Sequence, residues 1–555
     1  MPAFADALVT DDLTILLGLV TASIFLLSNL YKPQPLVHPI LLGRQSDVSR
    51  VRNPGESAVY RYYGTGIMGR FPVRPQRDVH TLIDHIKPGV DAPRTLWSTK
   101  ITNNQIRERV IHFGAGLRRA GLKSSSNVLL LLNDSLEFLI TDLALASQGI
   151  PSFTLSSPAL LAPVLDVHPP TAVIIDASFL PHALEHVLDS AEAAHHVLIV
   201  LGEPDAQTTA RAARGVRLVR WPDIEEEGRQ SGVTELPAPP GSESVFTVSF
   251  YRDEEGNMQA AKLTHENLTA GVAAIRALVP PQNPLTALDT VVSAHSLSTA
   301  YGRAIAYTAL LEGASFGTLE GTKLYKSDIN SSPRPLDDLF TTKNLSLPSA
   351  TMLFIMPSHL NALVNAVLER AKKSFIFPVA WRHKLSGILD GHVTRESLWD
   401  RLVLNDARVA ILGAVAATLR GVVVSGGPLP ADLLTPARIA LSIPLVHAFT
   451  HPISTAPIFA SHPHDLQTFA HALPVAHVGP PVVNIEVKMK GVDDAAIERG
   501  EDPVGKLFVR GPPIGRLMDD EDSTTENEGQ EPWVATGVVA RAQTNGSFAI
   551  LEEGS

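Results

Sequence analysis

Short apolar runs alternate with amphipathic segments along most of this chain, and this alternation constrains the fold more than any other feature. The runs "NVLLLLND" (127–134), "TAVIIDAS" (171–178) and "HVLIVLG" (196–202) are uninterrupted, as in strands buried on both faces. Residues 103–122 carry apolar side chains at helical spacing and reach Gly121, a residue type common just after the last helical turn. The pattern predicts an α/β fold with stacked mixed or parallel sheets flanked by helices.

The composition bounds the class of protein. A chain of 555 residues with 45% hydrophobic residues is globular and long enough for two or more domains. Its formal net charge of −11 offers no electrostatic footprint for nucleic acid, so we expect no nucleic-acid partner. The chain has no cysteine, which excludes disulfides, thiolate metal sites and a cysteine nucleophile.

The N-terminal region carries a long uncharged stretch. Leu13 to Tyr31 would form a helix of about 28 Å at roughly 1.5 Å per residue, just enough to cross a bilayer core. Acidic residues precede it and Lys32 follows, which favours a single-pass membrane anchor at 1–31 with a cytosolic body over a cleaved signal peptide. The alternative is a buried core helix. We place the anchor in the endoplasmic reticulum membrane; the lipid droplet, outer mitochondrial and peroxisomal membranes are compatible alternatives.

The rest of the chain divides into three expected parts. Residues 32–96 are rich in Pro and Arg and are expected to be an extended leader packed on the body. Strand and helix patterns alternate over 97–475, where we expect the large α/β domain. Residues 476–555 are expected to form a smaller β-rich subdomain.

Several motifs follow one another from about residue 60 to the C-terminus. They are "LTHENL" (263–268), "VVSAHSLSTAYGRAIAYTALLEGASF" (291–316), "SLWDRLVLNDARVAILGAVAATLRGVVVSGGPLPADLL" (397–434), "HVGPPVVNIEVKM" (477–489), "VGKLFVRGPPIG" (504–515) and "PWVATGV" (532–538). Their order and spacing resemble the adenylate-forming (AMP-binding) enzymes, and within them the long-chain acyl-CoA synthetases. The resemblance implies the N-terminal domain of such an enzyme, which would use ATP, Mg²⁺ and CoA.

The segment before "LTHENL" departs from the family pattern. The family's phosphate loop has the form Thr-Ser-Gly-Thr-Thr-Gly-x-Pro-Lys-Gly, in which hydroxyls, backbone N–H groups and a lysine surround the ATP phosphates. Aligned on Thr264, these positions hold residues 251–260, where only Gly256 survives and Gln259 replaces the lysine. A carboxylate about 4 Å from a phosphate costs roughly 4 kcal/mol at an effective dielectric near 20. We therefore expect no tight ATP binding in the usual pose.

The same loop lacks glycines where a phosphate cradle needs positive φ, because Asp253 and Ala260 stand at those places. We expect an exposed strand-to-strand turn around Glu254–Asn257 instead. Its acids would face solvent, and Gly256 and Asn257 would take positive φ.

Two further motifs are altered. Where the family has Tyr-Gly-x-Thr-Glu, with the aromatic on adenine and the Glu on Mg²⁺, this chain has Phe449 first and Ile453 last. An isoleucine cannot ligate a hard cation that requires oxygen. Where the family has Thr-Gly-Asp, with the Asp on the ribose, this chain has Thr536 and then Val538. The resemblance therefore implies that no catalytic residue is intact, with Gln259, Ile453 and Val538 at degenerate positions.

The segment "SGGPLP" (425–430) is nearly intact by contrast. In the family it lies against the adenine; the alternative reading is a tight strand-to-helix turn whose glycines serve packing. The resemblance leaves a vestigial nucleotide site made of Gly256, Thr264, Ser425, Gly426, Gly427, Phe449 and Thr536.

The sequence ends at "GSFAILEEGS", close to where the family's hinge lies. The resemblance implies that the mobile C-terminal domain, with its catalytic lysine and part of the CoA site, is absent, or that an exon is missing from the sequence. We expect no bound cofactor.

Histidines give two further candidates. His295 stands where the family carries a histidine near the acyl pocket, and the alternative is a hydrogen-bonded core histidine. His447 and His451 have the i, i+4 spacing of a helical metal pair, but Pro452 follows at once and the alignment places them at a strand end. We expect no metal site.

Two functions from different classes remain open. The first is a membrane-anchored, catalytically degenerate relative of long-chain acyl-CoA synthetases that binds fatty acid or acyl-CoA, or acts as a scaffold for an active synthetase. The second is an active AMP-forming fatty acid–CoA ligase with an altered nucleotide pose.

Overall fold

The computed structural model describes most of the chain, in eight stretches. They are residues 12–30, 34–89, 92–187, 197–212, 216–325, 333–467, 474–518 and 532–551.

The first large sheet is parallel except at one edge. In the described part it has eight strands in the order β20-β11-β10-β6-β5-β7-β8-β9, with β11 antiparallel to both its neighbours. The predicted apolar runs form β5, which is fully buried, and β7 and β8, which are buried except at their ends, as expected for strands covered on both faces. The strands are β5 (Val128–Leu131), β6 (Ser152–Leu155), β7 (Ala172–Asp176), β8 (Val197–Leu201), β9 (Arg217–Arg220), β10 (Val245–Arg252), β11 (Met258–Thr264) and β20 (Arg516–Leu517).

The second large sheet has the same design. Its described strands lie in the order β17-β16-β15-β14-β12-β13-β3-β4, parallel from β16 to β3 and antiparallel at both edges. The strands are β3 (Arg94–Leu96), β4 (Thr99–Ile101), β12 (Thr290–Ser293), β13 (Ser315–Thr318), β14 (Met352–Ile355), β15 (Gly421–Val424), β16 (Leu445–Phe449) and β17 (Phe459–Ala460). The predicted α/β architecture with two mixed sheets is confirmed.

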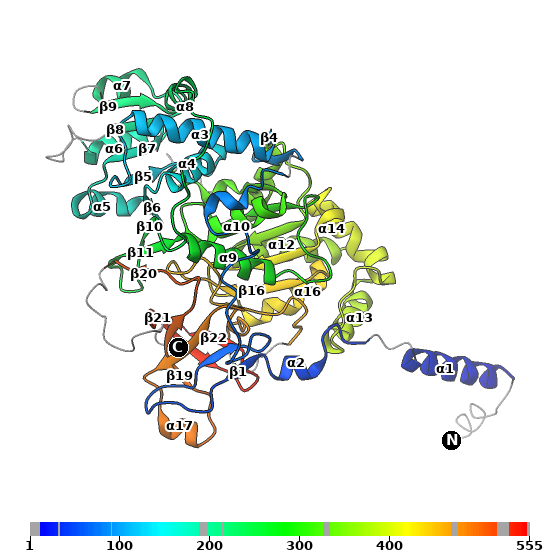
Figure 1. The fold of residues 1–555 in the computed structure, drawn as a ribbon. Coiled ribbons are helices and arrows are strands. Elements are labelled where there is room, and N and C mark those ends of the chain that lie inside the picture. Colours follow the sequence, from blue (N-terminus) through cyan, green and yellow to red (C-terminus); the bar gives the residue numbers. More distant parts are fainter. Residues whose placement is uncertain are drawn as a thin grey trace.

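Helices cover the sheets and join them (Figure 1). Helices α9 (His265–Ala277) and α10 (Ala300–Glu312) are buried along most of their length, and their side chains join residues of both sheets in one core. Helix α4 (Leu136–Ser147) is likewise buried, with only Glu137 not buried. The other helices include α3 (Asn103–Arg119), α5 (Leu161–Val167), α6 (Leu180–Val187), α7 (Ala206–Ala212), α8 (Trp221–Gln230), α11 (Pro335–Phe340), α12 (Pro357–Ala371), α13 (Phe377–Leu389), α14 (Asn405–Leu412), α15 (Val415–Thr418) and α16 (Leu434–Leu441).

The packing of helix α3 against α8 shows how the sequence determines a contact between two helices. Thr102 caps its N-terminus by accepting a hydrogen bond from the Gln105 N–H, and Gly121 takes φ +100° just after its end. Gly116 lets α8 approach closely, because a Cβ atom there would lie 1.9 Å from the Ile224 carbonyl oxygen. A larger residue at this position would push the two helices apart.

A third sheet brings together residues from both ends of the described chain. It is antiparallel, in the order β1-β2-β18-β19-β21-β22. The pairing of β2 with β18 is reinforced by Arg61, whose Nε donates to Glu486 Oε2 at 2.5 Å. The strands are β1 (Ser46–Val48), β2 (Tyr60–Tyr62), β18 (Glu486–Lys490), β19 (Val504–Arg510), β21 (Val534–Ala542) and β22 (Phe548–Leu551), with helices α2 (Pro39–Gly43) and α17 (Asp494–Glu498) beside them.

Helix α1 (Asp12–Leu30) covers nearly the range predicted for the anchor and projects away from the body (Figure 1). Leu13, Leu16 and Leu19 are each more than half exposed. Among the residues that the structure describes, no helix meets the length and hydropathy needed to cross a membrane. The predicted spanning role is therefore unsupported, and the predicted segments 1–11 and Tyr31 lie outside the described residues.

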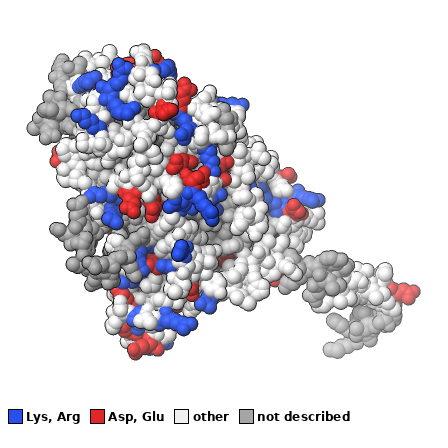
Figure 2. Space-filling model, in the orientation of Figure 1, with Lys and Arg blue, Asp and Glu red and all other residues white. Residues whose placement is uncertain are grey.

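Figure 2 shows charges of both signs interspersed on one face of the body and a mostly uncharged flank next to α1.

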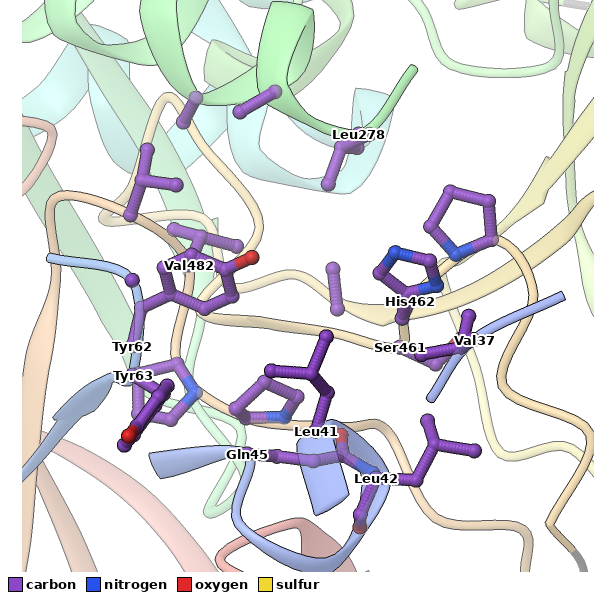
Figure 3. Close-up of a pocket in the computed structure, with 18 of the residues that line it drawn as sticks. Val37, Leu41, Leu42, Gln45, Tyr62, Tyr63, Leu278, Ser461, His462 and Val482 are labelled. Atoms are coloured by element: carbon purple, nitrogen blue, oxygen red, sulfur yellow. The ribbon is translucent and has the colours of Figure 1, made fainter. Parts of the chain in front are cut away.

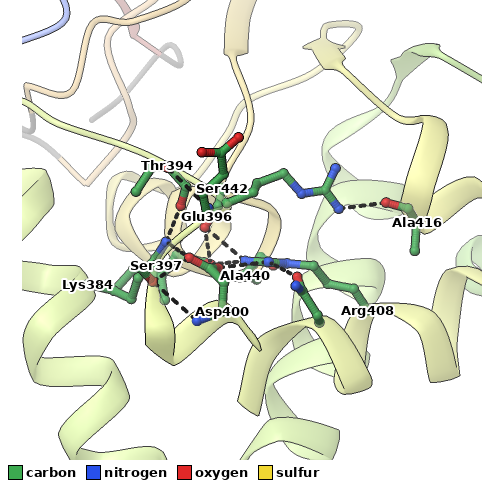
Figure 4. A network of polar contacts seen from close by, with 12 residues as sticks. Lys384, Thr394, Glu396, Ser397, Asp400, Arg408, Ala416, Ala440 and Ser442 are labelled. Carbon is green, nitrogen blue, oxygen red and sulfur yellow. Dashed lines mark hydrogen bonds and ion pairs between the residues drawn. The ribbon is translucent and has the colours of Figure 1, made fainter. Parts of the chain in front are cut away.

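A buried ionic cluster ties α13 to the segments that follow it (Figure 4). Asp400, fully buried in a short π-helical turn, accepts from Lys384 Nζ, from Arg408 and from the Ser397 hydroxyl at 2.8, 2.8 and 2.6 Å. Arg408 also donates to the Ser442 hydroxyl at 2.8 Å, just beyond α16. Two cations thus share one carboxylate in the core, which is tolerable because each has further polar partners.

Candidate functional site

A hairpin joins β10 and β11 in the segment that the resemblance aligns with the phosphate loop. Its turn is closed by the Asp253 N–H donating to the Asn257 oxygen and the Gly256 N–H donating to the Asp253 oxygen, both at 3.0 Å. The predicted strand-to-strand turn is confirmed. Gly256 takes φ +86°, but the prediction of positive φ at Asn257 was wrong, because a three-residue loop followed by a bulge needs only one left-handed residue.

A cavity of about 490 Å³ opens beside this hairpin. Arg252, Asp253 and Glu254 line it from the hairpin. Glu254 is exposed and Asp253 half-exposed, so the acids face solvent as predicted, and these two also border the cavity. Phe449 at the end of β16 and Val538 of β21 line it from the other two sheets. The remaining lining is largely apolar and includes Leu429, Ala448, Val475, Ala476, Val478, Ile550 and Leu551.

The mouth of the cavity carries more negative than positive charge. Burial pushes the pKa of Asp253 upward, but bonds from the Asn257 backbone N–H and the Gln259 side chain outweigh it and hold this pKa below its ordinary value. Asp253 is therefore ionised at neutral pH. The Arg252 guanidinium, the cation among the described lining residues, already donates to the Gly256 oxygen at 2.7 Å.

The "SGGPLP" segment follows β15 and places Gly426 and Gly427 in the cavity wall. Gly426 has φ +87°, and a Cβ there would lie 3.1 Å from His295 Cε1, so the turn and the close approach both require glycine. Ser425 is fully buried, and its Oγ lies 2.9 Å from His295 Nε2. Burial lowers the pKa of His295 to about 4, so its ring is neutral and hydrogen-bonded.

The other predicted positions lie outside the cavity lining. Gly256 is at the exposed hairpin tip, and Gln259 donates to Asp253 at 3.2 Å. Thr264 caps α9 by accepting from the Asn267 N–H at 3.2 Å. Ile453 is fully buried, and the Thr536 hydroxyl donates to the Leu507 oxygen at 3.0 Å. These side chains are engaged in packing and capping.

Sequence reasoning missed the wall formed by Ile550 and Leu551 of β22 and by residues 475–478. Ile550, Leu551, Val475 and Ala476 lie outside the motifs, and Val478, although inside "HVGPPVVNIEVKM", was given no role; such apolar side chains are typical of any buried strand or loop. Only the pairing of β22 with β21 brings the last described residues of the chain to this cavity.

The histidines near the cavity are neutral; His447 is buried and His451 is half-buried. Burial lowers the pKa of His447 and of His451 to about 4. His447 Nδ1 lies 2.8 Å from the His477 oxygen, which fixes its ring. Within the described ranges, no group of three or more His, Asp or Glu side chains is arranged to hold a metal ion.

The cavity can be tested for its fit to ATP and Mg²⁺. Polyphosphate binding needs backbone N–H groups or cations at the mouth, where this chain presents Asp253 and Glu254. Mg²⁺ needs oxygen ligands, and the family's glutamate position is the buried Ile453. The aromatic face of Phe449 and the apolar wall remain, so the lining suits an apolar or aromatic group better than a triphosphate.

Comparisons with known proteins agree with the fold. Among solved structures, an anthranilate CoA ligase in complex with anthranoyl-AMP matches with a TM-score of 0.59 and 16% identity, over 86% of this chain and 78% of that one. The luciferase-like enzyme of the Zophobas morio mealworm also gives 0.59, at 13% identity over 87% of this chain and 97% of that one. At these identities the likeness concerns the fold alone.

Curated relatives are closer in sequence. Long-chain-fatty-acid–CoA ligase 5 of Mus musculus is 24% identical over 463 residues, covering 81% of this chain and 64% of the relative. Ligase 1 of Homo sapiens is 24% identical over 362 residues, covering 64% of this chain and 48% of the relative. This chain thus spans less than two thirds of the length of these relatives.

A family profile described as "AMP-binding enzyme" matches residues 87–517, which is well over half of the chain. This range includes both large sheets, the hairpin and the "SGGPLP" turn. The protein therefore belongs to the AMP-binding enzyme family and is similar within it to the long-chain-fatty-acid–CoA ligases.

Proposed function

We propose that this acyl-CoA synthetase-like protein is catalytically degenerate and acts as a binding or scaffold protein for a fatty acyl ligand or for an active synthetase. The observation that carries the proposal is the pair of carboxylates, Asp253 and Glu254, at the cavity mouth where a phosphate loop would lie. A phosphate there would meet like charge from two solvated carboxylates, which opposes its binding.

The apolar wall supports a fatty acyl ligand. Val538, Ile550 and Leu551 line a cavity of about 490 Å³, within the range of roughly 300–1,000 Å³ typical of small-molecule pockets. Burying a chain of methylenes against this wall stabilises binding by about 0.8 kcal/mol per CH₂. The names of the curated relatives, long-chain-fatty-acid–CoA ligases, point to the same ligand class.

The decisive experiment is ATP–pyrophosphate exchange with a panel of fatty acids on the full chain, with a long-chain-fatty-acid–CoA ligase as positive control. Degeneracy predicts no exchange above a no-enzyme blank. Exchange above the blank would overturn the proposal and establish the second candidate, an active ligase with an altered nucleotide pose. That candidate is favoured by the family match and the intact "SGGPLP" turn.

Acyl binding needs its own test, because an inactive protein need not bind lipid. Gly427 lies in the cavity wall, and a Cβ atom there would make only ordinary contact with the Pro357 ring at 3.7 Å, so Gly427→Trp should fill the cavity and lower fatty-acid affinity at least tenfold. Gly241→Trp, at an exposed position outside the cavity, is the matched control. Equal affinity of both variants would exclude this cavity as the acyl site. Displacement of a fluorescent fatty acid provides the measurement.

Replacing residues 251–260 with the family's phosphate-loop residues tests the proposal that this protein no longer binds ATP. We expect little gain in ATP binding, because Ile453 and Val538 still lack the Mg²⁺ and ribose partners. Micromolar ATP affinity from this one graft would mean that the rest of the site is competent. Isothermal titration calorimetry with Mg²⁺ present measures the outcome.

We also infer that α1 attaches the protein to a membrane surface. Ile15, Leu17 and Phe25 are each more than half exposed on a helix that projects from the body, and burying them in lipid would remove this apolar area from water.

A further inference from the structure

Helix α13 and the segment that follows it carry large apolar side chains on their outer side. Phe375, just before the helix, is 94% exposed, and Leu389 at its last position is 78% exposed. We call this exposed apolar set the α13 face; it consists of Phe375, Val379, Leu389, Leu398 and Leu402, each more than half exposed. Exposed apolar side chains gathered in this way mark an interaction surface.

Aromatic rings connect the two segments of the α13 face. The His383 ring on α13 lies 6.1 Å from the ring of Trp399, which follows Leu398 directly and precedes the π-helical turn that holds Leu402. On α13 itself, the half-buried Trp381 lies 5.9 Å from Phe377. Amphipathic rings of this kind concentrate where a membrane meets water.

The charges around the α13 face are mostly basic, although the chain as a whole has a net charge of −11. Helix α13 contains no Asp or Glu. The exposed acids on either side are Glu369, which pairs with Lys372 at 2.8 Å, and Glu396. Exposed apolar and aromatic side chains with a basic rim fit a lipid surface that carries negative charge. The exposed basic residues are Arg370, Lys372, Lys373, Arg382 and Arg401.

The leader fixes where the chain that carries α1 leaves the body. The Leu36 N–H donates to the Gly391 oxygen just beyond α13, and Leu41 of α2 points into a cavity of about 210 Å³ beneath the leader (Figure 3). Ile40, one residue earlier, is 73% exposed and does not line this cavity. Leu30, the last residue of α1, is six residues from Leu36, so in any conformation the two are at most about 20–22 Å apart. A leaflet that holds α1 is therefore within about one length of α13 from the α13 face.

We propose that the α13 face rests on an anionic membrane leaflet once α1 has attached the protein, with Phe375 and Leu389 entering the headgroup region and Lys373 and Arg382 meeting lipid phosphates. The short connection to α1 makes this second contact intramolecular, so a face too weak to hold the body by itself engages the leaflet at high effective concentration. The inference rests on the attachment of α1 proposed above, and it adds the surface that sets how the body is oriented on the membrane.

The test uses the absence of cysteine, because one introduced cysteine then takes an environment-sensitive fluorophore at a single chosen place. Three full-length variants are compared: Phe375→Cys on the α13 face, Leu16→Cys on α1, and Ala210→Cys, exposed on α7 at the opposite end of the body (Figure 1). On phosphatidylcholine vesicles with about 30% phosphatidylserine, we expect fluorescence to rise at least about twofold in the first two variants and to stay unchanged in the third.

The possible results separate the two proposals. A rise in Leu16→Cys alone would overturn the role of the α13 face and leave the attachment of α1 standing. No rise in either variant would overturn both proposals. A rise in Phe375→Cys with protein concentration and without vesicles would mean that a second copy covers the face, which would also overturn its role in lipid contact.

A matched pair of charge changes tests the choice of lipid. Vesicles of phosphatidylcholine alone should give a response of Phe375→Cys at least about threefold smaller. Adding Lys373→Glu and Arg382→Glu should weaken its response to the anionic vesicles at least about fivefold. Arg211→Glu with Arg217→Glu makes the same change of charge at exposed positions of α7 and β9 and should leave the response unchanged. Equal losses with both pairs would overturn the proposal, and the comparison of the two vesicle types decides the case if a charge variant fails to fold.

Discussion

At the scale of single residues, the acids of the hairpin are held in place by their own turn. Asp253 accepts from the Asn257 N–H at 2.8 Å and from Gln259 at 3.2 Å, so its carboxylate stays fixed at the cavity mouth. Glu254 lines the same mouth, whereas Glu255, one residue further on, does not. Of these three adjacent acids, two border the cavity and one does not.

This difference gives a charge-specific prediction. The double variant Asp253→Asn, Glu254→Gln should raise the affinity for AMP about three- to tenfold at low salt, because two partly solvated like charges are removed from the phosphate. Glu255→Gln should change it less than twofold. Equilibrium dialysis at 20 and 300 mM salt measures the effect, which should shrink at high salt. Equal effects of both variants would mean that the carboxylates act only through long-range charge.

The buried carboxylate Asp400 gives a stability prediction. Asp400→Asn should lower the free energy of unfolding by about 3–5 kcal/mol, because Lys384 and Arg408 would be left buried without a counter-charge. Burial pushes the pKa of Asp400 upward, but bonds from Lys384 and Ser397 outweigh this and hold it below 3.8. Its stabilisation is therefore complete well above pH 3.8 and is lost as pH falls through the lower, folded-state pKa.

Urea unfolding at pH 7 measures the cost of this substitution. Glu226→Gln is the control, because its pair with Arg229 is about half exposed on both sides and should contribute less than about 1 kcal/mol. A similar small loss in both variants would show that the Asp400 cluster is no more stabilising than a surface pair.

At the scale of secondary-structure elements, α1 and α2 form the apolar end of the chain. Ile40 in α2 is 73% exposed, and α1 carries exposed leucines along its described length. The backbone N–H of Leu36 donates to the Gly391 oxygen at 2.9 Å, which fixes the start of the leader to the end of α13. The membrane-facing elements are thus connected to the body at a defined point.

Deleting residues 1–31 should release the protein from membranes, because α1 carries most of the exposed apolar side chains outside the body. Membrane flotation compares this deletion with the full chain. A second deletion variant that also carries Ile40→Ser tests whether α2 adds to the attachment. Continued flotation of both variants would mean that another surface binds lipid.

At the scale of the whole molecule, buried histidines link stability to pH. Burial lowers the pKa of His85, His265, His295, His447 and His451 to about 4 from the ordinary 6.5. Below pH 6.5 the unfolded chain binds more protons than the folded one, so stability falls as pH drops toward 4. Each histidine lowers the free energy of unfolding by up to about 1.4 kcal/mol for every unit by which the pH falls in this window.

The melting temperature should therefore be constant above pH 7 and fall steeply between pH 6.5 and 4.5. The variant His295→Gln should show a shallower fall, since one titrating group is removed while a side chain that can meet Ser425 is kept. A melting temperature independent of pH in this range would contradict the neutral state of these rings. Circular dichroism at several pH values provides the measurement.

Much of this architecture is readable from the sequence. Continuous apolar runs such as 128–131 are typical of strands buried on both faces, and the turn at Gly426 follows from its motif. The direction of the hairpin side chains could not be predicted from the sequence, because Asp253 is held toward the cavity by hydrogen bonds from Asn257 and Gln259. The wall formed by Leu551 is not readable either, since it depends on the long-range pairing of strands.

The third sheet has a consequence for how the chain is made. Arg61 of β2 pairs with Glu486 of β18, which lies 425 residues further along. A ribosome adding roughly 5–20 residues per second needs about 20 to 90 seconds to reach that partner. During this interval the β1–β2 ribbon has no partner on its inner edge, and an unpaired edge invites pairing with other nascent chains. The sheet that joins the two ends of the described chain is thus the last to close during synthesis, and the step at which chaperones would matter most.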